Sequence, residues 1–393
     1  MSAKRYSLVL DVGTTGTKAF VFNDRCEAIV KTYRAYPVSS PKSGWVEQDP
    51  HLLLKACIRV MRDAVKKSHI PVSRITALGI TNQRETTILW DANTLTPIYP
   101  AIVWEDRRTK HVCTSRRVRH QHEIRTKTGL SLDPYFSASK IEWILTHVPG
   151  AQTLADVGRL RFGTVDSWLL THLCEHAPHV TDETNAARTL LFNIRTKTWD
   201  PKLCTIFNIP ERILPAVYPS RAEFGWLHSE VIGRSIPVRA VIGDQQSSLY
   251  AAITSSQTPR ATTKVTYGTG TFVMQLLGTT CSLRAPFFTT LVPTDGGTAY
   301  ALEGKVTVSG PEVTKRLSSP KKLEIYLHDL SRQVNRYVKR LPVKPKEIVI
   351  DGGITRDPNL AILQEDVSGI RIRPLATYDG TALGVALLLR DSS

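Results

Sequence analysis

The stretch SLVLDVGTTGTKAFVF, residues 7–22, places a turn of glycine and threonine between two apolar runs. It is not a P-loop, because GxxxxGK[ST] would need a glycine where Lys18 stands. It is not GxGxxG either, since a β-rich run follows where a dinucleotide fold needs a helix. We therefore predict a β-hairpin whose backbone N–H groups and threonine hydroxyls can face a phosphate. Taken alone, such a hairpin can equally be an ordinary turn.

Composition favours a protein with a large core. The chain has 393 residues, of which 41% are hydrophobic, and this length favours two domains. No apolar run reaches the length of a membrane helix. The basic N-terminus leads into a run that Asp11 interrupts, so we expect a first strand and not a signal peptide. Six cysteines without metal spacing favour reduced thiols in the cytoplasm.

The charge is strongly basic. There are 51 Lys and Arg against 35 Asp and Glu, which leaves +16. Residues 107–127 alone carry eight Lys/Arg and three His with one Glu. Such a stretch can bind a polyanion, form a solvated helix face, or attract an anionic substrate. No nucleic-acid motif accompanies the charge, so we do not expect a nucleic-acid partner.

Short β-rich runs alternate with amphipathic helices, which predicts an α/β architecture. Strand character appears at 7–10, 75–80, 86–90 and 347–354, and helical spacing at 53–64, 137–148 and 327–341. The segment KVTYGTGTFVM (264–274) repeats the strand–turn–strand pattern of the N-terminus. A boundary near residue 240 would give two units, 1–240 and 241–393, with a cleft between them.

Two such hairpins facing each other could hold a triphosphate from both sides. The sequence Asp-Gly-Gly (351–353), after a buried strand, permits close backbone approach to a base or ribose, although it too can be an ordinary turn.

Asp-x-Gly-Thr-Thr, Tyr-Gly-Thr-Gly-Thr and Asp-Gly-Gly, in this order, resemble the two phosphate motifs and the adenosine motif of the actin/hexokinase/heat-shock ATPase superfamily. The connecting segments resemble the FGGY carbohydrate kinases and, within them, the glycerol kinases. These segments are GITNQRETTILWD (79–91), IVWEDRRT (102–109), GLSLDPYFS (129–137), FGTVDSWLL (162–170), TNAARTLLFNI (184–194) and GDQQSS (243–248).

The resemblance implies two actin-like (ribonuclease H-like) domains with mixed sheets flanked by helices, and an active site in the interdomain cleft. It implies ATP and Mg²⁺ as cofactors, glycerol as the substrate, a cytoplasmic location and no membrane span. It leaves open whether the protein is a homo-oligomer.

The resemblance also assigns a polyol site. Arg84 and Glu85 would bind two glycerol hydroxyls, although adjacent charges can also be a surface ion pair. Asp244 would be the general base that accepts the proton of the attacking hydroxyl. The remaining implied substrate contacts are Trp104 and Phe272 against the carbon chain, and Tyr135 and Gln245 as hydrogen-bonding groups.

The nucleotide site implied by the resemblance draws on both halves of the chain. Its residues are Thr14, Thr15, Gly16 and Lys18 in the first loop, Thr269 and Gly270 in the second, then Gly310, Gly353 and Asp357, with Asp11 and Asp244 as ligands of Mg²⁺.

Three departures from the family pattern concern the second half. The chain runs from PEVTKRLSSPKK (311–322) directly to a helix and the Asp-Gly-Gly strand, where relatives have a longer segment, and it stops soon after GTALGVALLL (380–389). Thr314 stands where a glutamine is expected, and Asp357-Pro358 replaces an asparagine pair. The alternatives to a compact glycerol kinase are therefore a kinase-like binding protein without turnover and a kinase for another polyol or sugar.

Overall fold

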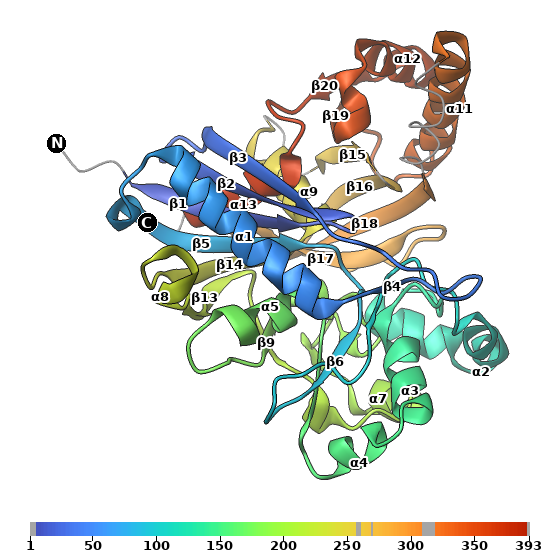
Figure 1. Cartoon of the computed structure of the whole chain (residues 1–393). Coiled ribbons are helices and arrows are strands. Elements are labelled where there is room, and N and C mark those ends of the chain that lie inside the picture. The colour runs from blue at the N-terminus through green and yellow to red at the C-terminus, as the bar shows by residue number, and fades with distance from the viewer. Residues whose placement is uncertain (1–4, 257–260, 269, 309–318, 391–393) are drawn as a thin grey trace. The chain divides into compact units, whose positions relative to one another are not determined.

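The computed structural model describes residues 5–256, 261–268, 270–308 and 319–390 (Figure 1). The chain separates into two compact units, Met1–Asp244 with Val385–Ser393 and Gln245–Gly384. The boundary near residue 240 and the functions assigned to the two halves stay predictions.

The first unit is built on a six-stranded mixed sheet with the strand order β13-β14-β5-β1-β2-β3. The hairpin predicted from residues 7–22 is confirmed: β1 and β2 are antiparallel, with Asp11 opposite Lys18. β5 pairs in parallel with β1, and β14 pairs in parallel with β5. The strands are β1 (Tyr6–Val12), β2 (Gly16–Asn23), β3 (Ala28–Ala35), β5 (Ile75–Asn82), β13 (Arg221–Trp226) and β14 (Pro237–Gly243).

The helix α1 (Pro50–Ser68) packs on β2 and β3 (Figure 1). It begins where Asp49 accepts hydrogen bonds from the backbone N–H groups of His51 and Leu52, and a proline occupies the first turn. The apolar residues spaced by three and four face the core, as the sequence predicts. The helix α13 (Gly380–Arg390) packs closely over β5, because a Cβ at Gly79 would lie 2.2 Å from Cγ1 of Val385.

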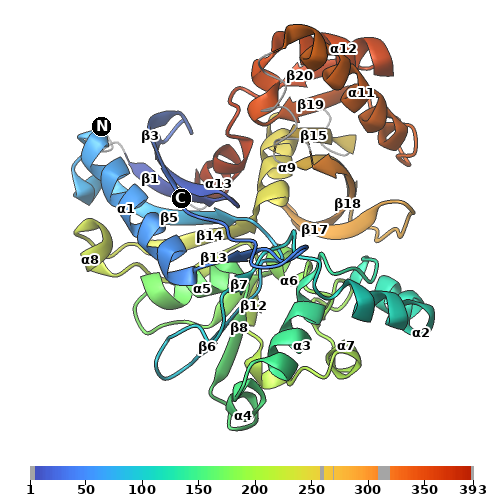
Figure 2. The same cartoon turned by 45° about the vertical axis from the view of Figure 1, so that its right-hand side comes forward.

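Most of the small strands and helices outside the main sheet come from the chain between β5 and β14, while one short strand and one 3-10 turn precede β5 (Figure 2). The predicted strand at 86–90 begins only at Ile88, because residues 83–87 form a loop. The basic stretch 107–127 is mostly helix α2. The strands are β4 (Glu47–Gln48), β6 (Ile88–Asp91), β7 (Ala101–Ile102), β8 (Leu160–Gly163), β9 (Val180–Asp182), β10 (Phe192–Asn193), β11 (Thr198–Trp199) and β12 (Ala216–Tyr218). The helices are α2 (Lys110–Thr128), α3 (Ser137–His147), α4 (Ala151–Asp156), α5 (Val165–Leu173), α6 (Glu183–Ala186), α7 (Pro201–Ile206) and α8 (Ser229–Ile232), with 3-10 turns η1 (Val72–Arg74) and η2 (Glu211–Ile213).

The second unit has its own six-stranded mixed sheet, in the order β17-β18-β16-β15-β19-β20. Helices α11 and α12 lie side by side in both views, and the apolar residues of α11 are buried as their spacing predicts. The strands are β15 (Thr263–Tyr267), β16 (Gly270–Gly278), β17 (Phe288–Thr294), β18 (Gly297–Val308), β19 (Glu347–Asp351) and β20 (Arg371–Pro374). The helices are α9 (Asp244–Thr254), α11 (Pro320–Val338) and α12 (Pro358–Ser368), with the 3-10 turn η4 (Gly353–Arg356).

The two sheets share the pairing pattern around their first strands. In the first unit β1 pairs antiparallel with β2 and parallel with β5. In the second unit β15 pairs antiparallel with β16 and parallel with β19. The internal repeat of the strand–turn–strand pattern is therefore confirmed, and two units of mixed sheet flanked by helices are the predicted fold class.

All six cysteines are free thiols. Within the residues that the structure describes, no helix is both long and apolar enough to span a bilayer.

Candidate functional site

The first glycine-threonine loop is a tight turn between β1 and β2. The backbone N–H of Gly13 donates to the carbonyl of Gly16 at 3.0 Å. Gly16 must lack a side chain, because a Cβ there would lie 2.8 Å from the backbone carbonyl oxygen of Arg34 in the adjacent strand. Thr15 is exposed, whereas Thr14 and Lys18 are half-buried. The loop therefore leaves Thr15 exposed, while its backbone is held against β3.

Side chains beneath this loop tie down its carbonyl groups. The hydroxyl of Tyr36 donates to the carbonyl of Gly13, and the amide of Gln48 donates to that of Thr14. Gln83, at the end of β5, in turn donates to Gln48 at 2.8 Å. The loop is thus braced through two successive side chains to the segment that carries Arg84.

Trp104 connects the loop to the predicted polyol residues. Its indole Nε1 donates to Oγ1 of Thr14 at 2.8 Å, which leaves the hydroxyl of Thr14 able to donate its own proton. The ring of Trp104 meets that of Tyr135 edge to face, with centroids 5.6 Å apart. Both aromatic side chains are buried.

Arg84 and Glu85 are buried and not a surface pair: their side chains are both 2% exposed. Nε of Arg84 lies 3.0 Å from Oδ1 of Asp244 and 4.0 Å from Oε1 of Glu85. One guanidinium thus joins the predicted base to a predicted substrate ligand within the first unit.

Arg188 was not identified from the sequence, although its segment was noted for its resemblance to the family. Its Nε lies 2.6 Å from Oε1 of Glu85, and its side chain is fully buried. The guanidinium also lies over the rings of Tyr135 and Phe136, at 5.5 and 5.0 Å from their centroids. Arg188 therefore connects Glu85 to the aromatic side of the site.

Asp244 begins α9 directly after β14, and its side chain is 30% exposed. The preceding N–H, that of Gly243, donates to Oγ1 of Thr184 at 2.8 Å. Thr184 donates to Oδ2 of Asp182 at 2.6 Å, and Asn185 joins the same carboxylate to Asn82 at the end of β5. This buried network supports the ends of both strands that lead into the site.

Asp182 lies at the centre of that hydrogen-bond network. It accepts hydrogen bonds from Thr184, Asn185 and Ser220. Burial raises its pKa to about 6, and the nearby charge of Asp166 acts in the same direction. The sequence analysis did not identify Asp182, which caps α6 through Thr184 and Asn185 and is joined by Ser220 from a separate segment.

The predicted residues of the second unit that the structure describes are mostly buried. Gln245 lies in the first turn of α9 and Phe272 in β16, and each is 6% exposed. A Cβ at Gly270 would lie 2.6 Å from the ring of Phe272, so the second loop needs glycine there for packing. Thr269, Gly310 and Thr314 lie outside the described residues.

The Asp-Gly-Gly segment has three distinct roles in the structure. Asp351 is 3.2 Å from the buried amine of Lys264. Gly352 has φ +101°, and a Cβ there would lie 2.3 Å from the carbonyl oxygen of Tyr267. Gly353, by contrast, has open space where a side chain would be. A contact of Gly353 with nucleotide stays a prediction.

Asp357 caps α12: its side chain accepts from the N–H of Asn359 at 2.9 Å, and Pro358 occupies the first turn. The Asp-Pro pair, which departs from the family pattern, thus has a local structural role. A contact of Asp357 with nucleotide stays a prediction.

The carboxylates present suit a metal only if the nucleotide supplies further ligands. Asp11 and Asp244 each face a cation, Lys18 at 3.5 Å and Arg84 at 3.0 Å. Within the described ranges no group of three or more His, Cys, Asp or Glu could hold an ion. Mg²⁺ commonly uses one or two carboxylates together with phosphate oxygens and water, so Asp11 and Asp244 as its ligands stay a prediction.

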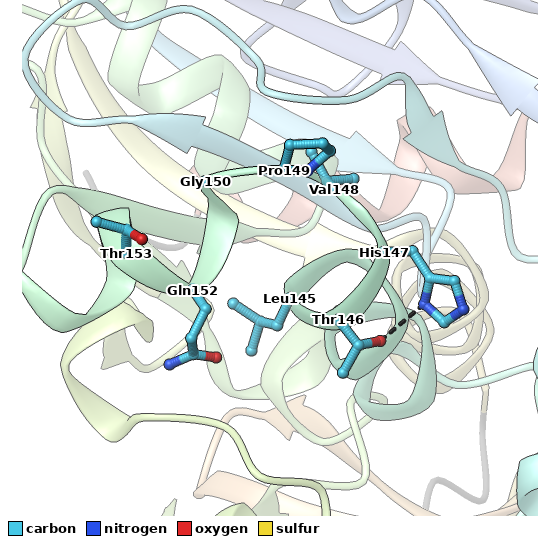
Figure 3. A pocket seen from close by; sticks show the side chains of 8 residues that line it. All are labelled: Leu145, Thr146, His147, Val148, Pro149, Gly150, Gln152 and Thr153. Atoms are coloured by element: carbon cyan, nitrogen blue, oxygen red, sulfur yellow. Dashed lines mark hydrogen bonds between the residues drawn. The ribbon is translucent and has the colours of Figure 1, made fainter.

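A separate hollow of ≈ 320 Å³ lies where α3 passes into α4 (Figure 3). Its lining consists of Leu145, Thr146, His147, Val148, Pro149, Gly150, Gln152 and Thr153. No predicted substrate or nucleotide residue is among them, so this hollow does not belong to the candidate site.

Several glycerol kinases share substantial sequence with the chain. The enzyme of Pseudothermotoga lettingae is 43% identical over 315 residues, covering 79% of this chain and 62% of that protein. The enzyme of Dichelobacter nodosus is 44% identical over 309 residues, covering 78% and 62%. The chain thus matches less than two thirds of the length of these relatives.

Solved structures agree in fold. The crystal structure of Plasmodium falciparum glycerol kinase with ADP has a TM-score of 0.88 at 27% identity, covering 99% of this chain and 90% of that one. A xylulose kinase from Lactobacillus acidophilus has a TM-score of 0.83 at 18% identity, covering 99% and 89%, which shows the fold alone.

The model of the N-terminal domain of the FGGY family of carbohydrate kinases matches residues 6–251. The match contains the first loop, the Arg84–Asp244 pair and the network beneath it. It covers more than half of the chain, and the chain therefore belongs to the FGGY family of carbohydrate kinases.

Proposed function

We propose that the chain is a glycerol kinase, which transfers the γ-phosphate of ATP to glycerol and yields sn-glycerol 3-phosphate and ADP. The observation that carries the proposal is the 3.0 Å contact between Arg84 and Asp244. Both residues lie in the same unit as Glu85, Trp104 and Tyr135, which the family resemblance assigns to a polyol-binding site. The similarity to glycerol kinases at 41–44% identity supports this substrate over other sugars.

In this proposal Asp244 accepts the proton of the attacking hydroxyl, and Arg84 orients the carboxylate. Arg84 and Glu85 hydrogen-bond the hydroxyls of glycerol, which offers little apolar surface. Trp104 and Phe272 contact the carbon chain and limit the size of the substrate, while Tyr135 and Gln245 hydrogen-bond the polyol.

ATP would be bound by residues of both units. Thr14, Thr15, Gly16 and Lys18 face the phosphates in the first loop, with Thr269, Gly270 and Gly310 in the second half of the chain. The open space at Gly353 supports a place there for the adenosine, and Asp357 lies nearby in sequence. Mg²⁺, held by Asp11 and Asp244, would neutralise phosphate charge.

The wider setting is also part of the proposal. Six free thiols support a cytoplasmic enzyme. Glycerol is the expected small-molecule partner, and a homo-oligomer stays open. We expect the basic surface of α2 to be solvated and not to bind nucleic acid.

A coupled assay of ADP release across a panel of polyols tests the proposal. Glycerol should give the highest kcat/KM, and Asp244→Asn should lower kcat by about 10²–10⁴-fold while ADP binding persists. Asp200→Asn is the matched control, because Asp200 likewise stands at the start of a helix and is paired with a cation, Lys127.

Other outcomes identify the alternatives. Calorimetric binding of glycerol or nucleotide without ADP release would indicate a kinase-like binding protein. A better substrate than glycerol would indicate a kinase for another polyol or sugar, and unchanged turnover in Asp244→Asn would remove Asp244 from the mechanism.

A further inference from the structure

The backbone at Glu85 has a conformation that side-chain-bearing residues rarely adopt. Its φ is +62°, and the N–H of Thr86 donates to the carbonyl of Arg84 at 2.8 Å, across Glu85. A hydrogen bond that spans one residue with φ near this value defines a γ-turn of the rare, strained kind. Such strain persists only where the surroundings hold the backbone in place, and it concentrates at functional sites.

The carbonyl oxygen of Glu85 is held by three donors. Oγ1 of Thr87 lies 3.1 Å away, Oγ of Ser137 lies 3.2 Å away, and Nζ of Lys140 lies 3.4 Å away. Ser137 and Lys140 are both in the first turn of α3. The start of this helix therefore fixes the turn that carries Glu85.

Lys140 also holds a second residue of the candidate polyol site. Its Nζ donates to the carbonyl oxygen of Tyr135 at 2.8 Å. One amine thus bridges the backbones of Glu85 and Tyr135, which are far apart in the sequence. The side chains of the same two residues are joined from the other side by Arg188.

A fully buried lysine is a costly way to fill a core position. The side chain of Lys140 is 0% exposed, and an apolar residue of similar length would fill the same volume without desolvating an amine. Burial lowers the pKa of Lys140 to about 7, opposed by the carboxylates of Glu85, Asp106 and Asp133 and reinforced by Arg107. Packing alone does not account for an amine in this place.

We propose that Lys140 is a positioning residue of the polyol site: by bonding the carbonyls of Glu85 and Tyr135, it fixes the strained turn that aims the Glu85 side chain. This inference rests on the proposed polyol kinase activity. It predicts that removing the amine weakens polyol binding and leaves nucleotide binding unchanged, because no nucleotide residue of the first loop contacts Lys140 among the interactions described.

The test compares Lys140→Met with wild type in the full chain. Methionine has a similar length but no donor. The KM for glycerol should rise about 10- to 100-fold, since small displacements of positioned groups have effects of this size. The kcat and the KM for ATP should stay within about twofold, because an interaction lost equally from ground state and transition state changes KM alone.

Two further variants separate positioning from stability. Leu145→Ala, at a buried position on the same helix, removes packing without touching the turn and should leave the KM for glycerol unchanged. Ser137→Ala removes one donor to Glu85 with little change in volume, and should raise the KM for glycerol about twofold to fivefold, a smaller loss than that of the Lys140 amine, which bonds two carbonyls. Ser137→Ala keeps the inference testable if Lys140→Met does not fold.

The outcomes are distinct. The inference is overturned, and the proposed function stands, if Lys140→Met has an unchanged KM for the polyol. If Lys140→Met does not fold, an unchanged KM in a folded Ser137→Ala overturns it in the same way. An equal loss in kcat and in the affinity for both substrates also overturns it, because it indicates a general structural role. If wild type neither binds nor phosphorylates any polyol, the proposed function fails, and the inference fails with it.

Discussion

Replacing Arg188 by methionine should destabilise the first unit and disturb the polyol site together. Nε of Arg188 lies 2.6 Å from Oε1 of Glu85, with the two side chains 0% and 2% exposed. Removing one member of a buried ion pair leaves an uncompensated charge and costs about 3–5 kcal/mol. Arg84 remains 4.0 Å from the same oxygen, so we expect the lower end, about 3 kcal/mol.

A double-mutant cycle isolates this interaction. Glu85→Gln removes the buried charge, so Arg188→Met should cost less in that background, with a coupling energy of about 1–3 kcal/mol. The free energies of unfolding come from urea titration followed by tryptophan fluorescence. Arg159→Met is the control, since Arg159 pairs with Asp91 but is 43% exposed, and should cost about 1 kcal/mol or less.

The reasoning would be refuted by either of two results. A loss below about 1 kcal/mol in Arg188→Met would mean that the pair is not buried as the structure has it. A coupling energy near zero would mean that Arg188 stabilises the unit through packing and not through Glu85.

Four further predictions concern other residues. Gly352→Ala should destabilise the second unit by more than about 1 kcal/mol in urea unfolding, because φ is +101° and the new Cβ would lie 2.3 Å from a backbone oxygen. Gly353→Ala should leave the free energy of unfolding unchanged yet weaken ADP binding measured by calorimetry. If Gly352→Ala and Gly353→Ala had equal effects on unfolding and on ADP binding, Gly353 would be removed from the nucleotide site. Thr184→Val removes the acceptor of the Gly243 N–H, so it should lower the free energy of unfolding by about 1–3 kcal/mol and also lower kcat. A variant with wild-type stability and kcat would contradict the positioning of Asp244 by this network. The pKa of Lys140 is about 7 in the fold and near 10.5 in the unfolded chain, so the native state binds fewer protons than the unfolded state between these pH values. The free energy of unfolding should therefore rise with pH from about 7 to 9. Lys140→Met should reduce this pH dependence, measured as the urea midpoint at each pH.

Local elements were predictable because their causes are local. The hairpin at residues 7–22 follows from a glycine-threonine turn between apolar runs, and the structure confirms it as β1 and β2. The helix α11 follows from apolar residues spaced by three and four. The helix start at Asp357-Pro358 was not predicted, because comparison with the family pattern directed attention to the missing amide.

The candidate site was predictable only in part. Resemblance to the family selected Arg84, Glu85 and Asp244, and the structure shows the Arg84–Asp244 contact within the first unit. The supporting residues carried no such signal. Arg188 meets Glu85 across a separation of 103 residues, and Lys140 meets it across 55.

The sequence by itself determined the α/β class, the repeated strand–turn–strand pattern and the kinds of side chain available to a polyol and a phosphate. It could do so because turn chemistry and apolar periodicity act between near neighbours. Only the tertiary structure decided that Glu85 lies in a strained turn and that Lys140 and Arg188 hold it from two sides. The physical reason is that a buried charge or a strained backbone is stable only where distant segments supply its partners, and sequence spacing does not record those contacts.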